Sequence, residues 1–187
     1  MNKTRSDEEL MLGYRGGDAD AFELLYGRHK GALYRYLLRQ CRVAAVAEEL
    51  CQDVWLNVIR ARERYEARAK FTTYLFHLAH NRLIDYYRRQ KNGLPVSYTD
   101  DPLLEEVPDG AQPAAETRLD LKRQAARLKE LIAGLPEAQR EAFLLREETG
   151  LSVEQIAEVT DVNPETAKSR LRYAVARLRH ALDGGGE

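Results

Sequence analysis

The sequence predicts an all-α protein, and three observations carry this prediction. Apolar residues recur every three or four positions along most of the chain, and no alternating run of β-branched residues indicates a strand. Helix-capping residues such as Ser6 and Ser152 precede these segments. A stretch rich in proline and acid, residues 92–118, separates them into two groups. We therefore expect two small helical domains, residues 6–91 and 119–183, joined by a flexible acidic linker.

Charge is distributed unevenly along the chain. The 187 residues hold 29 basic and 30 acidic side chains, so no global attraction to a polyanion is expected. Residues 1–91, however, carry 17 basic and 12 acidic groups, whereas residues 92–117 carry six acids and no base. Any affinity for nucleic acid must therefore come from local patches.

Several classes of protein are excluded by what the chain lacks. Its longest apolar run, Val43 to Ala47, is five residues, against about 20 for a membrane span, so we expect no membrane insertion and a cytoplasmic location. Cys41 and Cys51 form no CxxC pair, and we expect reduced thiols, with a redox role left open. No phosphate-binding glycine loop, nucleophile elbow or set of metal ligands is present, so we expect no enzyme, cofactor or metal.

The first domain should begin with three helices. Ser6 caps a helix with acids in its first turn, which stops at Gly16-Gly17. Asp18 opens a second helix that extends to about Arg28, and the chain is helical again from Lys30 to Cys41.

The next helix, residues 44–62, has an informative polar face. Its apolar stripe comprises Ala47, Leu50, Cys51, Val54 and Val58. On the opposite face Leu56 lies among polar side chains, a pattern typical of a protein-binding surface. Single exposed leucines are also common without a partner, so the pattern alone leaves both interpretations open.

A basic and aromatic segment follows, residues 60–91, with nine Lys or Arg against three acids. A surface that binds single-stranded nucleic acid needs cations to contact the phosphates and aromatic rings on which the bases can stack. If Thr72 or Thr73 caps a helix there, the inward stripe is Leu75, Leu78, Ala79, Leu83 and Tyr86, and the outer row is Tyr74, His77, Asn81, Ile84 and Arg88. We expect Leu75, Phe76 and Tyr86 in the core, and Tyr65, Tyr74 and Asn81 at a binding surface.

The second domain should end in a helix-turn-helix. A helix over residues 119–133 ends at Gly134. Ser152 and Gln155 then form a capping box for a helix over residues 153–159. Asn163 caps a last helix that runs from Pro164 to about Leu182.

The last helix is amphipathic and basic. One stripe, which should pack, comprises Ala167, Leu171, Ala174, Val175, Leu178 and Leu182. Five Lys or Arg and no acid lie between Lys168 and His180, whereas ten acids lie between Asp120 and Glu165. The basic character is therefore confined to the helix that could enter a DNA groove.

Residues 135–179, LPEAQREAFLLREETGLSVEQIAEVTDVNPETAKSRLRYAVARLR, resemble region 4 of bacterial sigma factors of the extracytoplasmic-function (ECF) group of the sigma-70 family. The resemblance extends over about residues 6–182, with the helix at 44–62 similar to region 2.2 and the segment after it similar to regions 2.3 and 2.4. It implies a factor that binds core RNA polymerase and directs promoter recognition and transcription initiation.

The resemblance also implies partners and sites. The region 2.2 face would bind the clamp helices of the polymerase β′ subunit through Glu49, Gln52, Asp53, Leu56, Asn57 and Arg60. The opened strand of the −10 element would meet Tyr65, Arg68, Lys70, Phe71, Tyr74, His77, Asn81 and Arg88. The −35 element would meet Glu165, Thr166, Lys168, Ser169, Arg172, Tyr173 and Arg177. The β flap and an anti-sigma factor are further implied partners.

Two departures from the family pattern touch the −35 surface. Glu165 stands where relatives commonly have glycine, and Tyr173 where they often have arginine. Because a carboxylate cannot contact phosphate and would accept from a cytosine amino group instead, we do not transfer a promoter sequence from relatives.

Two alternative functions and the role of the linker remain open at this point. A stand-alone helix-turn-helix regulator of duplex DNA would explain the last helix but not the Leu56 face or the basic-aromatic segment. A regulator that binds polymerase without promoter recognition is a further candidate. The linker is either an inert tether or an acidic strand that occupies the path of RNA in the polymerase.

Overall fold

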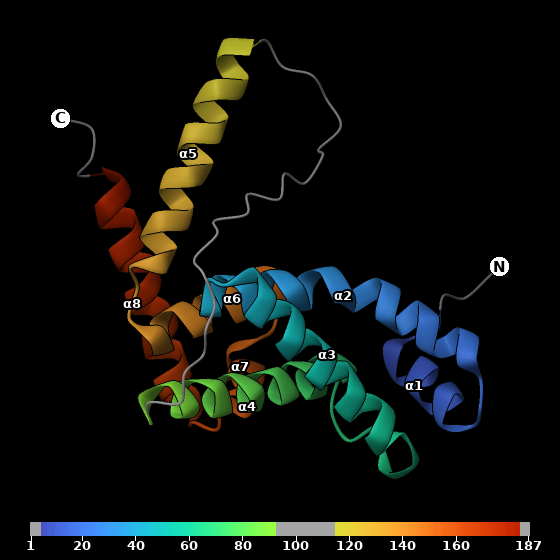
Figure 1. Ribbon diagram of the computed structural model, residues 1–187. Coiled ribbons are helices and arrows are strands. Elements are labelled where there is room, and N and C mark those ends of the chain that lie inside the picture. Colours follow the sequence, from blue (N-terminus) through green and yellow to red (C-terminus); the bar gives the residue numbers. More distant parts are fainter. Residues whose placement is uncertain (1–4, 93–114, 184–187) are drawn as a thin grey trace.

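A computed structural model describes residues 5–92 and 115–183 of the chain, and every regular element in these two ranges is helical (Figure 1). The elements are, in order, α1 (Asp7–Arg15), α2 (Ala19–Cys41), α3 (Ala44–Ala61), the short 3₁₀ helix η1 (Arg62–Arg64), α4 (Phe71–Lys91), α5 (Ala115–Ala133), α6 (Glu137–Thr149), α7 (Val153–Val159) and α8 (Pro164–Asp183). The all-α prediction is confirmed. Residues 93–114, most of the expected linker, lie outside the described residues.

Helices α1 and α2 begin as their capping residues predict. Ser6 Oγ accepts from Glu9 N–H, and the Glu9 side chain accepts from Ser6 N–H, which completes a capping box. The Asp18 side chain accepts from Ala21 N–H at the start of α2. The predicted division of α2 near Arg28 is wrong, because buried residues continue at helical spacing through that point (Leu25, Leu33, Tyr36, Leu37).

Helices α3 and α4 complete the first domain by packing on each other and on α2. The predicted core stripes are largely confirmed: Leu50, Val54 and Val58 of α3 and Leu75 and Phe76 of α4 are buried. The predicted threonine cap is wrong. Helix α4 begins at Phe71, Lys70 is its N-cap without a side-chain cap, and Thr73 is buried inside the first turn.

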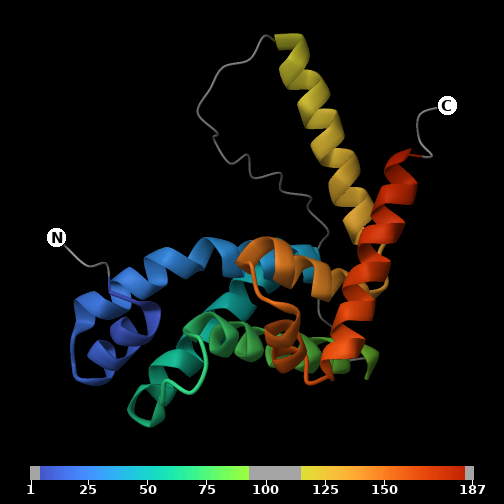
Figure 2. The ribbon, with the colours of Figure 1, turned by 180° about the vertical axis from the view of Figure 1, so that it is seen from behind.

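The second domain is formed by α5 to α8. Helix α5 starts at Ala115, four residues before the predicted boundary, and Figures 1 and 2 show it extending away from the rest of the molecule. The capping box of Ser152 and Gln155 is present at the start of α7, and Asn163 Oδ1 accepts from Thr166 N–H at 2.8 Å at the start of α8. The helix-turn-helix is therefore confirmed.

The apolar stripe of α8 is mostly confirmed. Ala167, Ala174 and Leu178 are buried, and α8 packs mainly on α6 and α7. Leu182, which was expected in this stripe, is exposed because α8 extends past the body of the domain at its C-terminal end.

The two domains contact each other through a buried polar cluster. Helices α6 and α7 pack against α2 and α4, as Figures 1 and 2 show from opposite sides. Glu141 of α6 is buried there, where Tyr36 Oη donates to its Oε1 at 2.8 Å and His80 Nδ1 lies 2.7 Å from the same oxygen. Beside it, Arg140 Nε donates to Gln40 Oε1 at 3.0 Å.

This cluster predicts a pH-dependent stability. Burial lowers the pKa of His80, but its hydrogen bond to Glu141 and the Glu141 charge outweigh burial, so that the pKa lies above its ordinary value of 6.5. A raised histidine pKa contributes stability that is complete below pH 6.5 and is lost as the pH rises through the folded-state pKa.

We expect urea unfolding to show a lower free energy of unfolding at about pH 8 than at about pH 6. The variant His80→Gln keeps a donor for Glu141 but cannot titrate, so its free energy of unfolding should change less between these two pH values. Identical pH dependence in the two proteins would show that other groups are responsible.

Candidate functional site

Helix α3 presents an exposed apolar residue among polar ones. Leu56 is 44% exposed, and Gln52 and Arg60, one turn before and after it, are also exposed. The remaining predicted members of this face are Glu49, which is exposed, and Asp53 and Asn57, which are half-buried. The predicted exposure of Leu56 is therefore confirmed.

The same face holds an apolar residue that the sequence analysis missed. Ile59 is 36% exposed and lies one turn beyond Leu56, so that the two side chains are neighbours on the helix surface. Behind them Val54, Trp55 and Val58 are buried in the core of the first domain. The face is therefore apolar at its centre, polar at its edge and supported by a packed helix.

The loop before α4 differs from its predicted form. Tyr65 and Phe71 were expected to meet DNA, but Tyr65 is 5% exposed and Phe71 is fully buried. Their rings pack edge to face with centroids 6.3 Å apart, and the Phe71 ring also contacts His29 of α2 at 5.4 Å. Because both rings lie in the core, neither can stack on a base in this structure, and the prediction for them is wrong.

Tyr74 is intermediate between core and surface. Its half-buried ring packs against Tyr65 with centroids 5.4 Å apart, and burial raises the pKa of its hydroxyl. Burial and nearby acids raise the pKa of Tyr65 to about 12. Both phenols are therefore neutral hydrogen-bond donors at neutral pH, and the exposed edge of Tyr74 is open to a ligand.

The predicted cations and amide are distributed along the loop and α4. Lys70, Asn81 and Arg88 are exposed, as predicted. Arg68 is also exposed, and its guanidinium is paired with Glu66 at 2.5 Å, a contact of the kind that a phosphate can replace. Of the expected outer row of α4, Asn81, Ile84 and Arg88 are exposed, and Tyr74 and His77 are half-buried.

His77 is the member of this row that α7 of the second domain contacts. His77 is half-buried, and its Nδ1 lies 3.3 Å from the carbonyl oxygen of Val159. The contact with α7 therefore leaves only part of this side chain accessible to DNA.

Helix α8 presents the third surface. Arg172 and Tyr173 are exposed, and the guanidinium of Arg172 lies over the Tyr173 ring at 5.1 Å from its centroid. This cation–π contact orients the arginine before any ligand binds. Lys168 lies 3.9 Å from Glu165, one turn before it, and both are exposed. Of the other predicted residues here, Arg177 is exposed, and Thr166 and Ser169 are half-buried.

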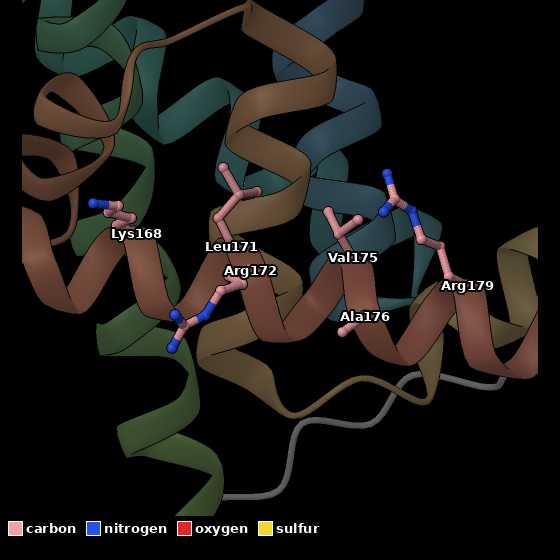
Figure 3. Close-up of a pocket in the computed structure, with 6 residues that line it drawn as sticks. All are labelled: Lys168, Leu171, Arg172, Val175, Ala176 and Arg179. Atoms are coloured by element: carbon pink, nitrogen blue, oxygen red, sulfur yellow. The ribbon is translucent and has the colours of Figure 1, made fainter.

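A shallow groove of about 420 Å³ runs along the same helix (Figure 3). Its lining consists of Lys168, Leu171, Arg172, Val175, Ala176 and Arg179. Lys168 and Arg179 lie at its two ends, and Leu171 and Val175 point to the same side between them. The cations at its ends could contact phosphates, and the apolar floor between them could contact the edges of bases.

Cys41 and Cys51 are unpaired and half-buried, and burial raises the pKa of both, to about 12 for Cys51. Within residues 5–92 and 115–183, no group of three potential ligands could hold a metal ion. In the same ranges no helix is both long and apolar enough to cross a membrane.

Comparison with known proteins assigns the family. The family model of Sigma-70 region 2 matches residues 25–93, and that of Sigma-70 region 4 matches residues 125–178. The RNA polymerase sigma factor CarQ of Myxococcus xanthus is 32% identical over 92% of this chain and 95% of its own length. The chain is an ECF-type member of the sigma-70 family.

Other relatives agree with this assignment. The ECF RNA polymerase sigma factor RpoE of Cereibacter sphaeroides is 34% identical over 88% of each chain. Among solved structures, CnrH in complex with the cytosolic domain of CnrY has a TM-score of 0.68 at 22% identity and covers 96% of this chain and 99% of that one. RpoE of Bartonella quintana in complex with the anti-sigma factor NepR has a TM-score of 0.65 at 24% identity, with 87% and 96% covered.

This ECF sigma factor therefore directs promoter recognition by RNA polymerase and the initiation of transcription. Sigma factors are initiation factors without enzymatic activity of their own. The comparisons support this function and not a stand-alone regulator of duplex DNA. The matched ranges leave out helix α1 and the first turns of α2.

Proposed function

We propose that the α3 face binds the β′ clamp helices of core polymerase. The observation that supports this most strongly is Leu56, which is 44% exposed on a rigid helix and is joined by Ile59. An apolar centre with a hydrogen-bonding edge is the composition of a binding hot spot. The edge consists of Glu49, Gln52, Asp53, Asn57 and Arg60.

The loop before α4 and the exposed row of α4 bind the opened non-template strand of the −10 element in this proposal. Arg68, Lys70 and Arg88 supply cations for phosphates, and Asn81 and the exposed edge of Tyr74 contact bases. Tyr65 and Phe71 have a different part, since their buried rings form the floor on which the loop and Tyr74 rest.

The α8 surface binds the −35 element. The domain boundaries follow from this division: residues 6–91 bind the polymerase and the −10 element, and residues 119–183 bind the −35 element. Residues 92–118 join them. The β flap is a further polymerase contact for the second domain, and the site of action is the cytoplasm.

An anti-sigma factor is a further partner in this proposal. The structure of RpoE in complex with the anti-sigma factor NepR resembles this fold, as does that of CnrH in complex with the cytosolic domain of CnrY. The packed arrangement of the two domains also fits a state in which part of the −10 surface is not free. Since α7 covers His77 of α4, we expect the protein alone to bind duplex promoter DNA poorly.

Arg172 provides the sharpest test of the −35 assignment. Arginine reads guanine with two hydrogen bonds in the major groove, and the Arg172 guanidinium is held over Tyr173 at an exposed position. We expect Arg172→Ala to weaken binding by about 1–3 kcal/mol and to relax specificity at one base pair. Selection of binding sites from a randomised promoter library by the reconstituted holoenzyme would measure this.

The matched control is Arg179→Ala, at the end of the groove. A phosphate contact carries no sequence information, so this variant should weaken all sequences alike and reduce the dependence on salt. An unchanged consensus with Arg172→Ala would refute the assignment of that residue.

A further inference from the structure

Helix α1 contacts both ends of the loop that leads into α4. At the far end, Glu8 Oε1 accepts a hydrogen bond from the backbone N–H of Phe71 at 2.7 Å. At the near end, Arg15 Nη1 donates to the carbonyl oxygen of Tyr65 at 3.1 Å. A third contact lies beside it, where the Arg62 guanidinium of η1 is 5.6 Å from the centroid of the Tyr14 ring.

The Glu8 contact replaces a missing helix cap. The first N–H groups of a helix have no partner within the helix, and a side chain at the N-cap usually accepts one of them. Lys70, the N-cap of α4, has no acceptor in its side chain and makes no such bond. A carboxylate from another helix therefore fulfils this role, and its charge is favourable at the positive end of α4.

Helix α1 is itself fixed in place. Its own residues Leu10 and Met11 are fully buried in the core of the first domain. Asp7 accepts from Arg28 Nη1 and lies against His29 Nε2 of α2, both at 2.7 Å. A helix held by core packing and by an ion pair can fix the position of whatever else it binds.

We propose that α1 positions the strand-binding loop, with Glu8 and Arg15 as positioning residues that hold the two ends of residues 65–71. Between these ends Arg68 and Lys70 are exposed, and ordering them before binding lowers the entropy cost of capturing a strand. This inference rests on the proposed binding of the −10 strand by the loop. It concerns a helix outside the range that matches Sigma-70 region 2.

The test uses the full-length protein and its holoenzyme. Glu8→Ala removes the acceptor, whereas Glu8→Gln keeps a carbonyl oxygen in the same place. We expect Glu8→Ala to speed hydrogen exchange at the Phe71 amide and to slow open-complex formation on linear duplex promoter roughly tenfold, the scale of a lost helix cap. Glu8→Gln should restore most of both, and affinity for core polymerase should stay within about twofold of the parent for each variant.

Arg15→Met is the second variant, because it removes the donor at the other end and keeps an apolar stem. It should slow open-complex formation in the same direction. The control Glu23→Ala removes one exposed carboxylate from α2 and should leave every measurement unchanged.

The outcomes separate this inference from the function on which it rests. If Asn81→Ala impairs open-complex formation and Glu8→Ala does not, α4 binds the strand and α1 has no positioning role. If Glu8→Ala lowers thermal stability and weakens core binding by the same factor as it slows promoter opening, the contact has only a folding role. That result would overturn the inference. If Asn81→Ala and Tyr74→Ala both open promoters normally, the proposed binding of the −10 strand by α4 and the loop before it fails first.

Discussion

Replacement of Leu56 by arginine is expected to lower the affinity for core RNA polymerase roughly thirtyfold or more, corresponding to about 2 kcal/mol. Leu56 is 44% exposed, whereas Val54, Trp55 and Val58 on the same helix are buried. Arginine at position 56 therefore extends into water in the free protein and introduces an unpaired charge into an apolar contact in the complex. Fluorescence anisotropy of labelled sigma factor titrated with core enzyme measures the loss.

Folding should change little in this variant. Surface substitutions away from core and caps usually alter the free energy of unfolding by less than about 0.5 kcal/mol. Leu24→Arg is the matched control, because Leu24 is another exposed leucine of the first domain, at 53%, and lies outside the α3 face. Asp53→Ala should weaken core binding as well, through the edge of the same face. Wild-type affinity in both Leu56→Arg and Asp53→Ala would show that the clamp assignment is wrong.

The first residue of a helix was predictable where the local sequence contains a capping side chain. Ser6, Asp18, Ser152 and Asn163 each accept the backbone hydrogen bond that their position in the sequence suggested. These signals are local, since the capping oxygen and the amide it binds lie three residues apart. The start of α4 was placed at the wrong residue because its cap comes from Glu8, 63 residues away in the chain.

Burial of the aromatic residues was harder to predict, for a related reason. Tyr65 precedes α4 in a loop, where no helical period indicates which way a side chain points. Its ring is buried because α1 and α4 pack around this part of the loop. The contacts with Arg15 of α1 and Tyr74 of α4 cannot be inferred from the local sequence. Leu56 was predictable because a helix fixes the direction of every side chain relative to its neighbours.

The contact between the two domains could not be derived from the sequence. In the sequence, Glu141 is one of several acids in α6 and nothing distinguishes it from the others. In the structure it is buried between Tyr36 and His80 of the other domain. A buried carboxylate needs partners, and here both partners lie more than 60 residues away. Only the folded arrangement shows that these groups satisfy one another.

Alanine at Asn81 should slow open-complex formation on linear duplex promoter by about fivefold to 150-fold, because one base contact is worth about 1–3 kcal/mol. Asn81 is exposed on α4, so the substitution removes hydrogen-bonding groups without disturbing the core. Taking a base out of a duplex costs a few kcal/mol, which contacts to the flipped base must offset. Permanganate footprinting of unpaired thymines follows the opening directly.

A template with a pre-melted bubble should partly rescue this variant, since the strand no longer has to be opened at the expense of base pairing. Tyr74→Ala should show the same pattern, with some added loss of stability because its ring packs on Tyr65. Asn92→Ala, an exposed amide at the other end of α4, is the matched control and should open both templates normally. Equal defects of Asn81→Ala on closed and pre-melted templates would mean that Asn81 serves polymerase binding or folding, because only a contact made with the flipped base loses its importance once the strand is already open.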